Sequence, residues 1–311
     1  MRKLFSLMLM LTLALILAAC GDSNDSDNNA ANGDSGDSED PDTLVIGFVP
    51  SQDSGNIADN VEPLAERLSE KLGINVESTV TVNFNALVEG MGANQIQIGF
   101  IPAFGYVLAN EQYDVDVILK SIRDGAGSYR AQYVVREDSG IDDLEDLEGK
   151  IWTFPDKGST SGYLFPSKHL MDEFDIDSAA DLETGFFSDV IQAGSHDTAA
   201  ISVLEGDADV ATTFEDVRDN LEDEYPDIKD NLKVIGYTDD IPNDTISVTK
   251  EISDDLKKRI KEAFLEFNDE QEMIDIMHEV YTWDAIEEAE DSEYQVVKDT
   301  YHEFKDIIEE E

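Results

Sequence analysis

From Thr43 onward, short apolar runs alternate with stretches in which apolar residues recur every three or four positions. Leu44–Val49 and Ile151–Phe154 have the length and composition of buried strands. After residue 162 the apolar positions follow helical spacing for about four turns. Repeated strand–helix units predict an α/β fold with mainly parallel sheets and helices on both faces. Further strands are predicted at 74–80, 96–101, 115–122, 129–136, 184–187, 208–213, 232–237 and 245–249, and further helices at 60–72, 84–91, 102–111, 195–204, 214–221 and 253–267, with helical pieces from Asp269 and Ser292.

The strand–helix units fall into two sets. One set ends at the Gly-rich turn near residue 127, and the second occupies about 135–235. The chain then returns through Ile241–Asp244 into one more strand and a series of acidic helices, which should pack back onto the first set. This order predicts two α/β lobes with a cleft between them and two crossovers: lobe 1 would be 43–128 plus 240–311, and lobe 2 would be 129–239.

The N-terminal segment has the pattern of a secretion signal. Arg2 and Lys3 precede an apolar run from Leu7 to Ala19 that only Thr12 interrupts, which predicts a signal peptide over 1–19. The run ends in Leu17-Ala18-Ala19-Cys20, which resembles the lipobox of bacterial lipoproteins, and this resemblance implies lipidation of Cys20. Residues 21–42 are almost free of apolar side chains and are expected to be a disordered tether. We therefore expect a domain anchored to the outer side of the cytoplasmic membrane.

The charge balance limits the possible partners. The sequence holds 71 acidic and 21 basic residues, a formal net charge of -50. Nucleic acid is not expected as a partner, because phosphate contacts need clustered Lys and Arg. The acidity favours a halophilic source, since concentrated salt screens self-repulsion. The single cysteine excludes an intramolecular disulfide, and four scattered histidines without a calcium-loop motif predict neither a metal site nor a cofactor.

The strongest chemical signal is the segment Gly158-Ser159-Thr160-Ser161-Gly162, between a predicted strand and a predicted helix. The first N–H groups of a helix lack internal partners and attract anions. Three hydroxyls add donors, and the glycines allow a close approach to the backbone. The segment therefore predicts an oxyanion cradle. An ordinary Ser/Thr helix cap is the alternative, although a cap needs only one hydroxyl.

Two more candidates stand at predicted helix starts. His196 follows the predicted cap Ser195 and could donate to an anion, or it could be a surface histidine. Asp216 follows a predicted strand, and ligands bind at the carboxyl ends of parallel strands. A carboxylate that favours the helix dipole is the alternative reading of Asp216.

Together these motifs resemble the phosphonate- and phosphite-binding proteins of ABC importers. The resemblance covers about residues 43–285 and rests on 158–166, Ser195-His196-Asp197, Asp209–Thr212 and Ile241–Asp244. It implies the type II periplasmic-binding-protein fold, an ABC permease as partner, and no enzymatic activity. It also implies that Ser159 and Thr160, with Ser161 beside them, hold phosphonate oxygens, and that His196, Asp216 and Asp244 complete the site. Phe84 stands where members of the family often carry a tyrosine, and Tyr106 is a candidate replacement phenol or a core aromatic.

Alternatives remain at this stage. An extracytoplasmic hydrolase could use Ser159, Thr160 and Ser161, although the central residue of this nucleophile-elbow-like run is threonine rather than serine. A receptor for another oxyanion, such as phosphate, is the other possibility. We expect a monomer. Asp216 and Asp244 are predicted to accept a hydrogen bond from a P–OH group and to repel sulfate, which has no such proton at neutral pH.

Overall fold

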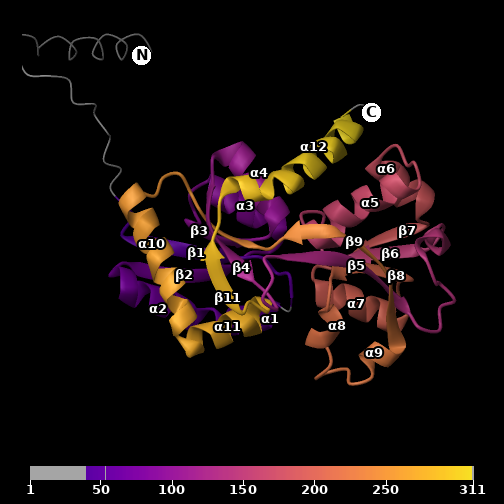
Figure 1. Ribbon diagram of the computed structural model, residues 1–311, viewed down its shortest axis with the longest axis horizontal. Coiled ribbons are helices and arrows are strands. Elements are labelled where there is room, and N and C mark those ends of the chain that lie inside the picture. The colour runs from indigo at the N-terminus through magenta and orange to yellow at the C-terminus, as the bar shows by residue number, and fades with distance from the viewer. Residues whose placement is uncertain (1–39, 53, 310–311) are drawn as a thin grey trace, which may run out of the picture. The chain divides into compact units, whose positions relative to one another are not determined.

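The computed structural model of the chain describes residues 40–52 and 54–309 (Figure 1). The predicted signal peptide, Cys20 and most of the predicted tether lie outside these residues. Between residues 40 and 309, none of the helices combines the length and apolar composition that a membrane span requires. Two β-sheets with helices on both faces confirm the predicted α/β fold class.

In the described part of the chain, six strands form the first sheet in the order β11, β4, β10, β3, β1, β2. β1 pairs in parallel with β2 and β3, whereas β10 and β11 pair antiparallel with their neighbours. The last strand was not predicted, because its sequence Ala-Ile-Glu-Glu offers one buried apolar residue. The strands are β1 (Thr43–Phe48), β2 (Asn75–Val80), β3 (Ile98–Ile101), β4 (Asp116–Ile122), β10 (Thr245–Val248) and β11 (Ala285–Glu288).

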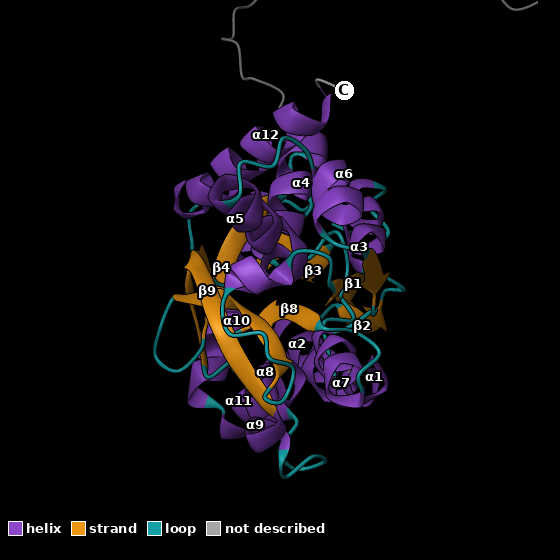
Figure 2. Cartoon of the chain, turned by 90° about the vertical axis from the view of Figure 1, so that its right-hand side faces the viewer, coloured by secondary structure: helices purple, strands orange, loops and turns teal. Residues whose placement is uncertain are grey.

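Helices cover both faces of the first sheet. Figures 1 and 2 place α3 and α4 on one face and α1, α2 and α11 on the other. The predicted helix over 60–72 is divided: Asn60 ends α1 and does not cap α2, while Gly73 stops α2 as predicted, with φ of 67°. The helices are α1 (Ser54–Asn60), α2 (Glu62–Leu72), α3 (Phe84–Gly92), α4 (Ala103–Tyr113), α10 (Asp254–Glu266) and α11 (Gln271–Tyr281).

Five strands among the described residues form the second sheet in the order β7, β6, β8, β5, β9. β6 is parallel to β7 and β8, and β5 is antiparallel to β8 and β9. Figures 1 and 2 show α5 and α6 on one face and α7 and α8 on the other. The elements are β5 (Ser128–Arg136), β6 (Ile151–Phe154), α5 (Phe165–Glu173), α6 (Ala179–Asp181), β7 (Asp189–Gln192), α7 (His196–Glu205), β8 (Val210–Phe214), α8 (Val217–Asn220), α9 (Ile228–Asn231) and β9 (Leu232–Pro242).

Two predictions for the second sheet were wrong. The predicted strand over 184–187 is a π-helical turn, Leu182–Phe186, because Phe187 N–H donates to Leu182 O at 3.0 Å and both side chains are buried. The strand follows at β7. The predicted helix over 214–221 is shorter, because β8 continues through Phe214 and α8 starts only at Val217.

Two short segments join the sheets. One is the turn after β4, where Arg123 and Ala126 exchange backbone hydrogen bonds, and the other is Asn243-Asp244 between β9 and β10. Residues 38–311 cluster as one compact unit, so the two predicted lobes correspond to sheets within this unit. That the lobes move as separate bodies stays a prediction.

The C-terminal helix α12 (Gln295–Glu309) contacts both sheets' helices, although the sequence predicted packing on the first lobe alone. On one side the Tyr301 ring lies 5.3 Å from the Phe104 ring of α4. On the other side Phe304 makes an edge contact with Tyr163, at 5.9 Å between ring centroids.

Each sheet buries one tryptophan in its core. Trp152 of β6 stacks on Tyr163 with an interplanar angle of 7°, and its indole N–H donates to Thr212 Oγ1 at 2.9 Å. The Thr212 hydroxyl in turn donates to Gly162 O. Trp283, just before β11, stacks on Phe100 at 5.0 Å. Both side chains are fully buried.

Candidate ligand-binding site

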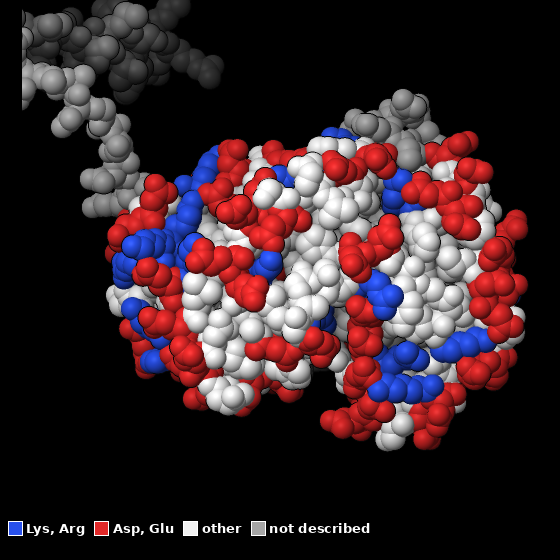
Figure 3. Space-filling model, in the orientation of Figure 1, with Lys and Arg blue, Asp and Glu red and all other residues white. Residues whose placement is uncertain are grey.

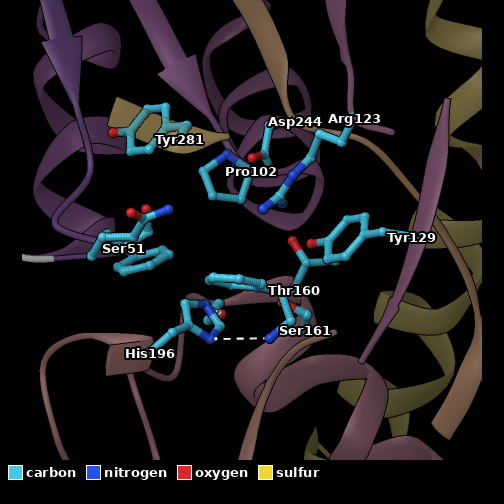
Figure 4. A pocket seen from close by; sticks show the side chains of 13 residues that line it. Ser51, Pro102, Arg123, Tyr129, Thr160, Ser161, His196, Asp244 and Tyr281 are labelled. Carbon is cyan, nitrogen blue, oxygen red and sulfur yellow. Dashed lines mark hydrogen bonds between the residues drawn. The ribbon is translucent and has the colours of Figure 1, made fainter. Parts of the chain in front are cut away.

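A small pocket lies between the two sheets, near the segments that join them (Figure 4). Segments of the first sheet contribute one wall, the second sheet contributes the other, and the connecting segments contribute Arg123 and Asp244. The lining is Ser51, Gln52, Phe84, Pro102, Arg123, Tyr129, Ser159, Thr160, Ser161, His196, Phe214, Asp244 and Tyr281.

The predicted cradle forms the start of one continuous helical segment. Ser159 is extended and caps it by accepting from Gly162 N–H at 3.0 Å, and a π-helical turn, Thr160–Leu164, runs directly into α5. Only glycine fits at position 162, because an added Cβ would lie 2.3 Å from the Pro155 ring. Tyr163 and Leu164 N–H donate to Ser159 O. Among the hydrogen bonds of the described residues, none uses the N–H groups of Thr160 and Ser161, so these donors are available for a ligand.

Thr160 also connects the two walls of the pocket. Its hydroxyl oxygen accepts from Phe104 N–H, in the first turn of α4, at 2.9 Å. This bond fixes one lone pair and leaves the hydroxyl proton free to be donated elsewhere. A second connection runs from His196 N–H to Ser51 O, at 2.9 Å. Thr160 thus faces the pocket and also links its two walls.

His196 is buried, and its ring acts through Ser159. Its Nδ1 accepts from Phe214 N–H at 3.3 Å, so this hydrogen-bond network assigns the proton of the neutral ring to Nε2. Nε2 lies 3.3 Å from Ser159 Oγ and donates to it, and Ser159 can then direct its own proton into the pocket. Burial, with a smaller contribution from the neighbouring Arg123 charge, lowers the pKa of His196 to about 3. The ring is therefore neutral at pH 7.

This depressed pKa predicts acid-sensitive folding. Between about pH 6.5 and pH 3 the unfolded chain binds a proton at His196 that the folded chain excludes, so this residue destabilises the fold as the pH falls through that range. We expect His196→Asn, whose amide oxygen can still accept from Phe214 N–H, to flatten the loss of stability between pH 6.5 and pH 4 in urea unfolding. His302→Gln, at an exposed side chain, is the matched control. Identical pH profiles for His196→Asn and wild type would contradict the assignment.

Asp244 faces the cradle from the second connecting segment (Figure 4). Burial raises the pKa of its carboxyl, and the Arg123 guanidinium opposes this rise. The indole N–H of Trp283 also lowers the Asp244 pKa, although its geometry falls short of a full hydrogen bond. A carboxyl with these neighbours can accept a hydrogen bond from a protonated ligand oxygen.

The structure adds residues that the sequence did not single out, and Arg123 is the principal one. Its guanidinium lies 5.6 Å from the Tyr129 ring centroid and 4.9 Å from that of Phe214. Tyr129 is buried beside Ser161. Burial and the nearby Asp244 charge raise the pKa of the Tyr129 phenol, and the Ser161 side chain opposes this rise. Phe84, which was predicted, contributes part of the aromatic wall.

Two predicted site residues lie elsewhere. Tyr106 is fully buried in α4, and its hydroxyl donates to Asp291 at 2.6 Å, so it is a core aromatic rather than a replacement phenol. Asp216 is outside the pocket, because β8 extends to Phe214 and places Asp216 two residues past the strand end. Asp216 instead lines a larger acidic cavity that adjoins the pocket, and burial raises its pKa, as do Asp219 and Glu215.

Residues 46–294 match the family model described as the periplasmic phosphonate substrate-binding protein of ABC transporters. The chain belongs to this family. A relative named phosphate-import protein PhnD, from Mycolicibacterium smegmatis, is 27% identical over 81% of this chain and 78% of the relative. The phosphonates-binding periplasmic protein of Escherichia coli is 28% identical over 74% of this chain and 67% of its own.

Solved structures of the same type share the fold. The binding component of a phosphonate ABC transporter from Pseudomonas aeruginosa superposes with a TM-score of 0.76, at 21% identity, over 85% of this chain and 87% of that one. PhnD1 of Prochlorococcus marinus, solved with methylphosphonate, gives a TM-score of 0.74, at 18% identity, over 86% and 99%. The family assignment and the type II periplasmic-binding-protein fold confirm what the sequence resemblance implied.

Proposed function

We propose that this phosphonate-family protein is a lipoprotein receptor that captures a small phosphonate or phosphite outside the cytoplasmic membrane and delivers it to an ABC permease. One observation carries the proposal: a helix start with three buried hydroxyls faces Arg123 and Asp244 across a small pocket. Donors on one side, a cation and a proton acceptor fit a partly protonated phosphorus oxyanion.

In this proposal, Thr160 and Ser161 donate to the ligand through their hydroxyls and N–H groups, and Ser159 donates through its hydroxyl. His196 is a positioning residue that orients Ser159. Asp244 shares one proton with a ligand oxygen, as the acceptor from a P–OH group or as the protonated donor to an ionised oxygen, and Phe84 packs on the substituent at phosphorus. The methylphosphonate complex of the Prochlorococcus protein supports a ligand of this size.

The cell-surface part of the proposal rests on the sequence. Cys20 would be lipidated and residues 21–42 would tether the domain to the membrane. The net charge of -50 supports a halophilic source, and the family supports the permease as the partner. In this proposal the receptor is a monomer that closes around its ligand and presents the closed domain to the permease.

Phosphate is the second candidate ligand, because the mycobacterial relative is named for phosphate import. A hydrolase using Ser159 has weaker support. Such a mechanism requires His196 Nε2 to take the Ser159 proton, whereas Phe214 N–H occupies Nδ1 and assigns the proton to Nε2.

The test is calorimetric titration of the full-length protein in molar salt with phosphite, methylphosphonate, 2-aminoethylphosphonate, phosphate and sulfate. We expect tight binding of a phosphorus oxyanion that Ser161→Ala weakens about tenfold or more, since hydrogen bonds to charged groups contribute about 1.5–3 kcal/mol. Ser202→Ala, at a partly exposed serine on α7 outside the pocket, is the matched control. Tight phosphate binding would favour the second candidate, and no heat from any of the five anions would refute a phosphorus receptor.

A further inference from the structure

Arg123 is held from both sides of the pocket. It directly follows β4, in the turn that joins the two sheets, and its backbone N–H donates to Ala126 O at 3.1 Å. On the first-sheet side its guanidinium donates to Thr282 Oγ1. On the second-sheet side the guanidinium lies over the rings of Tyr129 and Phe214. The side chain is thus positioned by contacts with neutral groups.

The Arg123 guanidinium forms no ion pair with a carboxylate of the described residues. None of the ion pairs among the described residues includes it, whereas the next two arginines along the chain pair with Glu215 and Asp138. This is notable in a chain with 71 acidic residues. Figure 4 shows the guanidinium end directed toward the middle of the pocket, between Asp244 and the cradle. The charge is therefore available to a bound anion.

Arg123 also lies between the pocket and an adjoining acidic cavity. It lines the pocket, where it is the one Lys or Arg among the described lining residues, and it lines the adjoining acidic cavity. That cavity is bordered by nine carboxylates of the described chain: Asp124, Asp197, Glu215, Asp216, Asp219, Asp223, Glu224, Glu279 and Asp284. Acidic side chains also cover much of the surface in Figure 3. An anion in the pocket consequently depends on Arg123 for charge compensation.

We propose that Arg123 is a specificity-determining residue that offsets the second negative charge of the ligand, so that the pocket prefers a dianionic phosphorus head, to which a protonated Asp244 donates a hydrogen bond. This inference rests on the proposed function. The helix start supplies about half a positive charge, enough for part of one negative charge. Arg123 supplies the full charge that the second one requires, in a site of low dielectric constant.

The experiment compares phosphite with hypophosphite at pH 8, in molar salt, by calorimetry on the full-length protein. At this pH phosphite is a dianion, since the second ionisation of such oxyanions lies at about pH 6, while hypophosphite has one ionisable oxygen and carries a single charge. Wild type should prefer phosphite. Arg123→Gln should reduce this preference by about tenfold or more, and Arg123→Lys should retain it even where both affinities fall. Arg130→Gln is the matched control, because Arg130 also lies over a ring, that of Tyr237, but does not line the pocket.

A purely structural role for Arg123 would weaken both anions equally and leave the preference unchanged, which would overturn this inference alone. Loss of the preference in Arg123→Lys would also overturn it. Absence of binding of either anion by wild type would refute the proposed function, and this inference with it.

Discussion

Replacing Thr160 with valine is expected to weaken binding of the preferred phosphorus oxyanion by about a hundredfold or more. The ligand loses a hydroxyl donor, and a hydrogen bond to a charged group contributes about 1.5–3 kcal/mol. The link between the two walls also loses its acceptor for Phe104 N–H, and a buried N–H left unpaired costs about 1–3 kcal/mol. In the proposed closure of the lobes around ligand this link belongs to the liganded state, so the two losses add in the dissociation constant.

Calorimetry and thermal unfolding of the same variants separate binding from folding. Valine matches threonine in shape, and Thr160 is fully buried, so the unliganded fold should survive. Thr160→Ser keeps the hydroxyl and should remain within about tenfold of wild type. Thr184→Val, at an exposed threonine outside the pocket, is the control. If Thr160→Val bound within about threefold of wild type, the cradle would not be the oxyanion site.

Replacing Asp244 with asparagine is expected to raise sulfate affinity about tenfold or more while weakening phosphite or methylphosphonate. An ionised Asp244 accepts from a P–OH group but repels the unprotonated oxygens of sulfate, and the amide of asparagine can donate to them. The measurement is the ratio of the sulfate and phosphite dissociation constants at pH 7. Asp240→Asn, at an exposed position near the end of β9, is the control. An unchanged ratio would refute selectivity through Asp244.

The sign of the pH dependence follows from the same carboxyl. Burial raises the Asp244 pKa, so its proton is retained to higher pH than in a free aspartate. Wild type should bind sulfate more tightly as the pH falls and Asp244 becomes protonated, whereas Asp244→Asn should show no such gain. Sulfate binding by wild type that weakens on acidification would contradict this mechanism.

Contiguous features of the site could be predicted from the sequence, and dispersed ones could not. Ser159, Thr160 and Ser161 stand together after an apolar strand, so a cradle followed from helix-start chemistry alone. Arg123 carries no comparable signal, because it is a single cation in a Gly-rich turn and its role depends on Tyr129 and Phe214 folding around it. Tertiary context alone supplies that information.

The predictions of the fold divide in the same way: elements with a strong local pattern were predicted, and elements whose conformation depends on their partners were not. Parallel strands with dense apolar runs, such as β1 and β6, were predicted nearly to the residue. The acidic strand β11 and the π-helical turn at Leu182–Phe186 were missed, because their partners rather than their own composition decide their conformation. Asp216 lies outside the pocket for a related reason: β8 ends one residue later than predicted, at Phe214, and Asp216 follows it with a φ of 67°.

The positions of the two tryptophans make the pocket visible to fluorescence without a label. Trp152 is linked to the cradle backbone through the Thr212 hydroxyl, which accepts from the indole N–H and donates to Gly162 O. Trp283 lies against the Asp244 carboxyl on the opposite wall. Indole emission responds to nearby charge and to packing, so each wall carries its own intrinsic reporter. Single Trp→Phe variants would thus assign the emission change on ligand addition to the cradle or to the carboxyl that faces it.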